Sequence, residues 1–153
     1  MTDSEYSICE TQGYIFELAA DLGYDMELFA NEYLASRFCE KSFDTGYSRY
    51  FAADAEESWE IFYPEIKDKL KKYEEGKHFR ADAAAWIGFT YRQLWFETAL
   101  PSRELVHRIP FLDMLRLYPG LHTIDEEMAA ERLIERYALK QKEDSERRTQ
   151  WKE

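Results

Sequence analysis

One stretch of the chain, residues 79–99, constrains the fold more than any other. Its apolar residues fall on nearly every side of a helix and include Trp86, Ile87, Phe89, Tyr91, Leu94, Trp95 and Phe96. A helix that is apolar all round has to be covered by other elements. Charged and polar residues interrupt the stretch, so it lacks the run of about 20 apolar residues that a membrane span needs. We therefore expect a buried central helix.

The rest of the chain also has helical patterns, so the sequence predicts an all-α fold, a compact bundle of about six to seven helices. Only six glycines and four prolines are present, which argues against many short strands joined by turns. A further helical turn is expected after Pro64. Apolar spacing and terminus signals predict the helices at about 4–22, 25–45, 53–62, 79–99, 102–109, 110–118 and from 123 onward.

The length of 153 residues fits one domain with a single core. We expect residues 1–139 to form one all-helical domain. From Lys140 onward the sequence is polar and has no apolar pattern, so residues 140–153 are predicted to be a flexible C-terminal tail. The charged segment 67–77 is interpreted as a solvated helix end and loop rather than a domain boundary, because neither half alone would form a comfortable core.

The two cysteines, Cys9 and Cys39, both lie inside helical patterns and form no CxxC or other metal-binding spacing. Two thiols without a signal-peptide pattern predict a reducing, cytoplasmic compartment. Cys39 lies close to Arg37 and Lys41, which could activate a thiol. We favour a buried apolar role for Cys39, because no base accompanies it.

The net charge of −11 is confined to one part of the chain. Residues 1–62 contain fourteen Asp and Glu against three Lys and Arg, whereas residues 63–153 contain seventeen of each class. A negative field repels nucleic acid and anionic membranes and attracts basic surfaces. We therefore expect neither direct nucleic-acid binding nor membrane binding. The alternative is that the acidity only aids solubility, because clustering along the chain does not establish clustering in space.

A candidate partner-binding site lies where the first two predicted helices meet. Tyr24 follows the helix-ending Gly23 and stands among acidic residues, a combination that suits a basic protein surface. This corner is expected to be exposed, although a half-buried position for the tyrosine remains an alternative. The predicted partner-binding residues are Asp21, Tyr24, Asp25, Glu27 and Glu32.

Motifs for catalysis or metal binding are missing from the sequence. The three histidines, His78, His107 and His122, are not spaced three or four residues from one another or from a cysteine. There is no GxSxG motif, no phosphate-binding glycine loop and no HExxH motif. We therefore expect a protein without enzymatic activity, cofactor or metal.

Two alternatives to this interpretation stay open. The first is a small enzyme with a site around Arg92, His122 and Asp125. Against it, Thr123 and Glu126 have the spacing of a capping box at the start of the last helix, which explains this segment structurally. The second alternative is a structural protein that associates with itself, as a homo-oligomer, through its surplus of aromatic residues.

One stretch, from Trp86 through Ala129, carries a familiar pattern of residues. These are Trp86, Ile87, Gly88, Tyr91, Arg92 and Trp95, then Thr98, Ser102 and Leu105, then Tyr118, Gly120, His122, Thr123, Asp125, Glu127 and Ala129. In this stretch the chain resembles a family of small, uncharacterised bacterial proteins. Residues 13–17 and 23–25 also match, so the resemblance spans most of residues 10–135. The chain departs from the family pattern at Leu100–Pro101 and at Pro119. Members are often encoded beside toxins of the ADP-ribosyltransferase type, which implies an antitoxin-like or accessory role without assigned catalytic residues.

These observations favour an acidic protein-binding inhibitor that neutralises a basic partner. An antitoxin acting on a toxin fits this description. So does an anti-CRISPR-like inhibitor from a mobile element or phage, in which the acidic face acts as a nucleic-acid mimic in the groove of a nucleic-acid-handling enzyme.

Overall fold

The computed structural model describes residues 1–45 and 53–142, and this part of the chain is all-α, without a β-strand. The predicted fold class is therefore confirmed, with slightly more helices than expected. The elements are α1 (Asp3–Asp21), α2 (Met26–Leu34), α3 (Arg37–Cys39), the π-helical segment η1 (Glu40–Asp44), α4 (Ala55–Ile66), the 3-10 turn η3 (Lys67–Lys69), α5 (Ala81–Glu97), α6 (Ser102–Arg108), α7 (Phe111–Leu121) and α8 (Glu126–Arg136).

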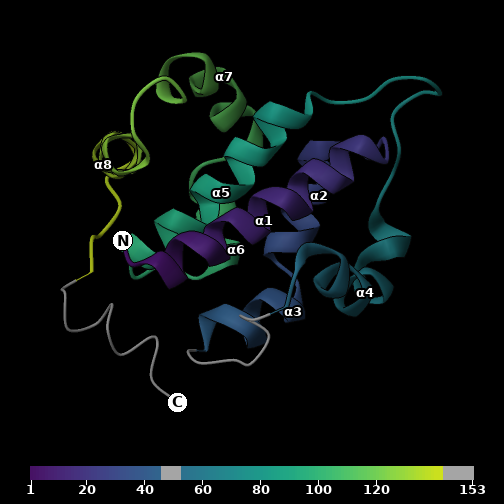
Figure 1. Ribbon diagram of the computed structural model, residues 1–153, viewed down its shortest axis with the longest axis horizontal. Helices are drawn as coiled ribbons and strands as arrows, with labels where there is room; N and C mark the ends of the chain where they lie inside the picture. Colours follow the sequence, from purple (N-terminus) through teal and green to yellow (C-terminus); the bar gives the residue numbers. More distant parts are fainter. Residues whose placement is uncertain (46–52, 143–153) are drawn as a thin grey trace.

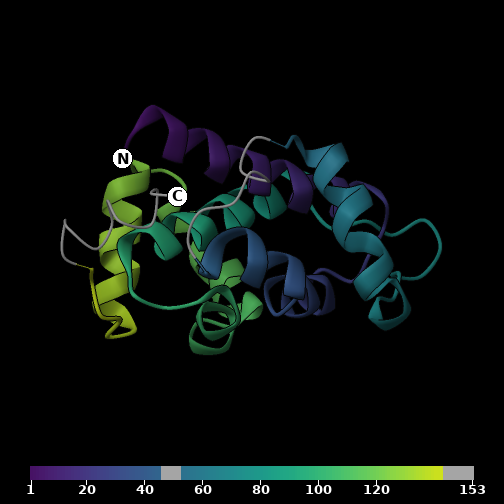
Figure 2. The same ribbon diagram turned by 90° about the horizontal axis from the view of Figure 1, so that it is seen from below.

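Helix α5 is the centre of the fold, as its sequence predicts. It packs most extensively along α1 and also contacts α6, α7 and α8. Every side chain from Thr90 to Phe96 is buried. Figures 1 and 2 show α1 and α5 lying side by side along the length of the molecule, with α1 on the outer side in Figure 2, α8 at one end and α4 at the other. One long face of α1 therefore extends from α8 to α4.

Two glycines allow α1 and α5 to approach each other closely. A Cβ atom on Gly13 would lie 2.9 Å from the carbonyl oxygen of Ala85. A Cβ atom on Gly88 would lie 2.7 Å from the carbonyl oxygen of Gln12 and 2.7 Å from Cγ of Phe16. All three distances are shorter than van der Waals contact permits, so larger residues would force the helices apart.

Aromatic side chains join α2 to α4. The Tyr33 and Phe62 rings pack edge to face with centroids 4.9 Å apart, and Phe29 stacks on Trp59 at 5.6 Å. Phe38, on α3, completes this cluster with its centroid 5.5 Å from that of Phe62. Aromatic residues bury large areas with defined geometry, so they fill the space between short helices efficiently.

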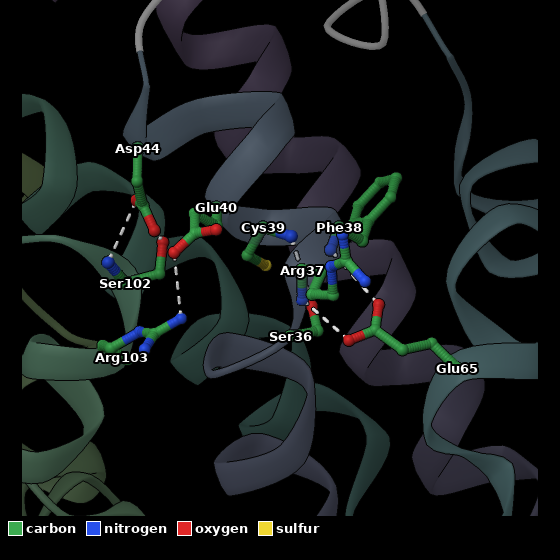
Figure 3. Close-up of polar contacts among 9 residues, drawn as sticks. All are labelled: Ser36, Arg37, Phe38, Cys39, Glu40, Asp44, Glu65, Ser102 and Arg103. Carbon is green, nitrogen blue, oxygen red and sulfur yellow. Dashed lines mark hydrogen bonds and ion pairs between the residues drawn. The ribbon is translucent and has the colours of Figure 1, made fainter.

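The predicted continuous helix over residues 25–45 is wrong, because the chain breaks after Leu34. The Ser36 hydroxyl accepts a hydrogen bond from the Cys39 amide at 3.1 Å and starts α3 as its N-cap. The Glu65 carboxylate, from α4, accepts from the Arg37 amide at 2.7 Å and the Phe38 amide at 3.3 Å (Figure 3). These two side chains satisfy the free amides that a new helix start exposes.

Two prolines lie inside helices instead of beside them. Pro64 was expected to begin a new turn and Pro119 to end a helix, yet α4 runs on to Ile66 and α7 to Leu121. Each proline stands in the last turn of its helix. Each proline therefore removes one backbone hydrogen bond close to the end of its helix.

The last helix begins later than the capping-box spacing predicts. Its N-cap is Asp125, whose carboxylate accepts from the Met128 amide at 2.9 Å. The Thr123 hydroxyl instead donates to the carbonyl oxygen of Gly120 at 2.8 Å. The predicted capping box of Thr123 and Glu126 is therefore wrong, because an aspartate two residues later serves as the cap.

The start of the predicted flexible tail is tied to the bundle. The Lys142 amide donates to the carbonyl oxygen of Glu97 at 2.9 Å, and the Ala99 amide donates to that of Lys140 at 3.3 Å. Leu139 is buried beside them. Residues 140–142 of the predicted tail are thus bonded to the bundle, and residues 143–153 lie outside the described residues.

None of the helices in the described ranges is both long enough and apolar enough to span a bilayer.

Candidate functional site

The corner between α1 and α2 does not expose Tyr24. Gly23 turns the chain with a φ of 86°, and the Tyr24 side chain then folds inward, where it is 8% exposed. Its hydroxyl lies 2.9 Å from that of Tyr63. Burial and this hydrogen bond raise the pKa of Tyr24 to about 12. The expectation that Tyr24 is an exposed contact residue is therefore wrong.

The basic segment that follows η3 lies against the same corner. The Asp25 amide donates to the carbonyl oxygen of Lys71 at 2.8 Å, and the Asp25 carboxylate caps α2. Lys69 Nζ lies 3.9 Å from a Glu32 carboxylate oxygen, and Lys72 Nζ lies 5.2 Å from the centroid of the Tyr24 ring. Acidic and basic segments that are separate in the sequence thus meet in space, which weakens the negative field at this corner.

The acidic residues of α1 form a stripe along its outer face. Glu10, Tyr14, Glu17 and Asp21 follow one another at spacings of four, three and four residues, which places them on one side of a helix. Tyr14 is 53% exposed, more than any other large apolar or aromatic side chain in the described ranges. The spacing is visible in the sequence, so this stripe could have been found without a structure.

A hollow lies on each side of Tyr14. The first, here called the α1–α4 hollow, has a volume of about 390 Å³. Its lining consists of Thr11, Tyr14, Glu17, Leu18, Asp21, Asp54, Ala55 and Glu56. Of the predicted partner-binding residues, Asp21 is the one that lines it. Glu27 is exposed elsewhere, on α2.

The second hollow, here called the α1–α5 hollow, also reaches the start of α8 and has a volume of about 240 Å³. Its lining consists of Tyr6, Glu10, Gly13, Tyr14, Ala85, Trp86, Phe89 and Glu126. Tyr14 belongs to both hollows and stands between them. None of these residues is among the predicted partner-binding residues, because they come from three helices that only the fold brings together.

The two hollows share one electrostatic character. Six carboxylates line them, namely Glu10, Glu17, Asp21, Asp54, Glu56 and Glu126, and among the residues that the structure describes no Lys, Arg or His contributes to either lining. Within the described ranges, none of the six forms an ion pair. An uncompensated negative surface with an aromatic residue at its centre attracts cationic groups, and salt weakens that attraction.

A buried charge cluster holds α1, α5 and α6 together behind this face. The Arg92 side chain is 0% exposed, and its guanidinium donates to Oε1 of Gln12 at 2.9 and 2.7 Å and to the Ser102 hydroxyl at 3.0 Å. The Phe43 ring centroid lies 3.7 Å from the guanidinium carbon, a cation–π contact. Polar partners and an aromatic face thus replace the water that Arg92 loses on burial.

Asp44 supplies the negative charge nearest this cluster. Its Oδ1 accepts from the Ser102 amide at 3.0 Å and from the Ser102 hydroxyl at 2.8 Å (Figure 3). Burial raises the pKa of Asp44, whereas the positive charge of Arg92 is the largest of the effects that lower this pKa. Near Asp44 and Ser102, Arg103 forms an exposed ion pair with Glu40, in which a guanidinium nitrogen lies 3.1 Å from a carboxylate oxygen (Figure 3).

The enzymatic site considered from the sequence is not assembled. Arg92 is enclosed by the cluster just described, whereas His122 is exposed at the end of α7, where its ring stacks on that of Tyr118 with centroids 4.2 Å apart. Asp125 caps α8. Because Arg92 is paired inside the protein and the other two residues have local roles, this proposed acid–base site is wrong.

Both thiols are expected to resist modification in the folded protein. Cys9 and Cys39 are 0% exposed, and burial raises the pKa of Cys39 to about 11 and that of Cys9 further above its usual value. Buried thiols that stay protonated are poor nucleophiles. Titration with a chromogenic disulfide reagent should detect no thiol in native protein and two after unfolding in guanidinium. Rapid labelling of either cysteine in native protein would contradict the assigned burial.

Metal ligands do not gather anywhere in residues 1–45 and 53–142, where no three His, Cys, Asp or Glu side chains are placed to hold an ion. Comparisons of the chain with protein-family models, with curated proteins and with solved structures find no match.

Proposed function

We propose that this protein is an inhibitor that binds and neutralises a basic protein partner through the outer face of α1. The observation that supports the proposal is the pair of hollows flanking Tyr14, lined by six carboxylates without a basic residue among the described linings. Aromatic residues that become buried when two proteins associate, inside a polar rim, are typical of the energetic centre of a protein interface. Tyr14, exposed between the two acidic hollows, is placed to become such a centre.

A protein partner fits this face better than the alternatives. Phosphate groups would be repelled by the carboxylates, which argues against nucleic acid as the ligand. The hollows are shallow surface features on either side of an exposed ring, so a partner that lies across α1 would contact both. A toxin with a basic active face and a nucleic-acid-handling enzyme with a phosphate-binding groove are the two partner classes that match.

The test compares two triple variants with the same change in net charge. One reverses charges on this face, and the other reverses charges elsewhere. The face variant carries Glu17→Lys, Asp21→Lys and Glu56→Lys, which all line the α1–α4 hollow. The control variant carries Glu75→Lys, Glu131→Lys and Glu135→Lys, three exposed positions outside both hollows. Wild-type protein and both variants are tagged, incubated with lysate of the native host at low salt, and the bound proteins are identified by mass spectrometry.

The expected result is a basic protein that wild type and control retain and that the face variant loses. Affinity measured with the purified partner should fall at least about tenfold for the face variant, equivalent to roughly 1.4 kcal/mol. Added salt should weaken the wild-type complex, because exposed charges are screened. Equal losses in both variants would show that net charge alone attracts the partner, and an unchanged face variant would refute this location.

A further inference from the structure

The α1–α5 hollow has the size of a single side chain rather than that of a small-molecule site. Its volume of about 240 Å³ lies below the roughly 300–1,000 Å³ typical of pockets for drug-sized ligands. Its walls carry four aromatic residues, Tyr6, Tyr14, Trp86 and Phe89. Such walls place aromatic rings around whatever enters.

Three of these rings are held in place by contacts within the protein. The Tyr6 ring packs edge to face on that of Phe89 with centroids 5.1 Å apart, and its hydroxyl donates to Glu126 at 3.3 Å. The Trp86 ring packs edge to face on that of Tyr118 at 5.6 Å. Walls that are already fixed lose little conformational entropy when a ligand binds.

The close approach of α1 and α5 creates the bottom of the hollow. Gly13 and Ala85 lie there, and a Cβ atom on Gly13 would come within 2.9 Å of the Ala85 carbonyl oxygen. Neither residue has a side chain long enough to fill the space between the rings. The hollow is therefore a consequence of the same helix crossing that forms the core.

Charge determines which side chain the hollow accepts. Glu10 and Glu126 are its charged lining residues, and both are acidic. Glu126 also raises the pKa of Tyr6, as expected for a carboxylate beside a phenol. Aromatic faces combined with carboxylates attract cations through the negative potential of the rings and through direct electrostatics.

We propose that the α1–α5 hollow is an aromatic cage that receives the cationic end of an arginine or lysine side chain. The assignment of that side chain to the partner protein rests on the proposed function, whereas the cage itself does not. The cage deepens that function, because it provides a specific anchor beside the general attraction of the acidic face.

The cage is tested without any partner. Full-length protein is titrated with N-acetyl-argininamide and with N-acetyl-lysinamide while the amide and indole resonances are followed by NMR. The neutral isostere N-acetyl-citrullinamide is the matched ligand control. We expect saturable shifts at the Trp86 indole and around Gly13 with a cationic amide, at millimolar affinity because a free amino acid lacks the rest of the interface, and no saturable shift with citrullinamide.

Two variants assign the binding to the cage. Tyr14→Ala removes one exposed wall, and Glu10→Gln with Glu126→Gln removes both charges at constant size. Each should weaken binding of the cationic amide at least threefold. Glu135→Gln, on the same helix as Glu126 but outside the hollow, should leave the affinity unchanged. Equal shifts with citrullinamide, wild-type affinity in the glutamine variant, or no shifts at tens of millimolar would each overturn the cage.

The two proposals fail in distinguishable ways. If the cationic amides did not bind while the salt-dependent complex with the partner stayed intact, the acidic interface would stand without the cage as its anchor. Saturable binding of argininamide with no effect of the Glu17, Asp21 and Glu56 reversals on partner retention would keep the cage and refute the proposed inhibitory face.

Discussion

Replacing Arg92 with methionine is expected to lower the free energy of unfolding by about 3–5 kcal/mol, the usual cost of removing one partner from a buried charge network. The guanidinium supplies three hydrogen bonds to Gln12 and Ser102, and methionine supplies none. Gln12 Oε1 would keep one described donor, the Tyr33 hydroxyl at 3.2 Å. Methionine fills a similar volume, so the loss reports mainly the missing charge and hydrogen bonds.

The deficit in the Arg92 variant should depend on pH through Asp44. Arg92 is the largest influence that lowers the pKa of this buried carboxyl, so its removal raises the folded-state pKa further. A carboxyl with a raised folded pKa favours the fold when protonated, and this contribution is lost as pH rises through that pKa. The destabilisation relative to wild type should therefore be smaller at about pH 5 than at about pH 8.

Arg103→Met provides the matched control for this experiment. Arg103 forms an exposed ion pair with Glu40 near the same cluster, and such pairs contribute about 1 kcal/mol or less. Urea denaturation of the three proteins, followed by tryptophan fluorescence at both pH values, measures the differences. A loss of about 1 kcal/mol or less in the Arg92 variant would show that the network contributes little. A larger deficit that does not change with pH would instead contradict the influence of Arg92 on Asp44.

The parts of the fold that follow from local pattern are the parts that the sequence predicts well. The central helix is recognisable because apolar residues cover nearly its whole circumference over residues 79–99, and α5 occupies that region. The N-cap of α2 at Asp25 is likewise a local signal and is present. Helical periodicity and capping depend on residues within a few positions of one another, so one sequence contains the information.

The features that the sequence does not predict depend on residues far apart in the chain. The break at Ser36 is stabilised by Glu65. Its carboxylate accepts hydrogen bonds from the amides of Arg37 and Phe38, which are 28 and 27 residues away in the sequence. The burial of Tyr24 depends on Tyr63 and on the chain near Lys72. No local pattern indicates that a basic segment folds back onto an acidic corner, so charge counted along the chain does not reveal that Lys69 lies beside Glu32 and Lys72 beside Tyr24.

The candidate site was predictable in part. Asp21 is among the predicted binding residues because acidic residues cluster near it. Tyr14 is not among them, although its spacing from Glu10, Glu17 and Asp21 indicates a single helix face. The walls contributed by Trp86, on α5, required knowledge of the crossing between α1 and α5. The site depends on that crossing for its existence.

Gly88→Ala is accordingly expected to destabilise the protein by about 2–3 kcal/mol, because its methyl group has no space at the helix crossing. The new Cβ would lie 2.7 Å from the Gln12 carbonyl oxygen and 2.7 Å from Cγ of Phe16. Backbone on one side and a fully buried ring on the other leave no flexible atom to yield. The favourable helix propensity of alanine, about 1 kcal/mol over glycine, offsets only part of this cost.

Gly120→Ala separates the steric effect from helix propensity. Gly120 lies inside α7, and a Cβ atom there meets nothing within 4 Å. This variant should therefore be as stable as wild type or more stable by up to about 1 kcal/mol. If thermal unfolding gave both glycine variants the same stability, the close contact between α1 and α5 would be refuted. The hollow beside Tyr14 would then lose its structural basis, because its floor at Gly13 and Ala85 is made by that contact.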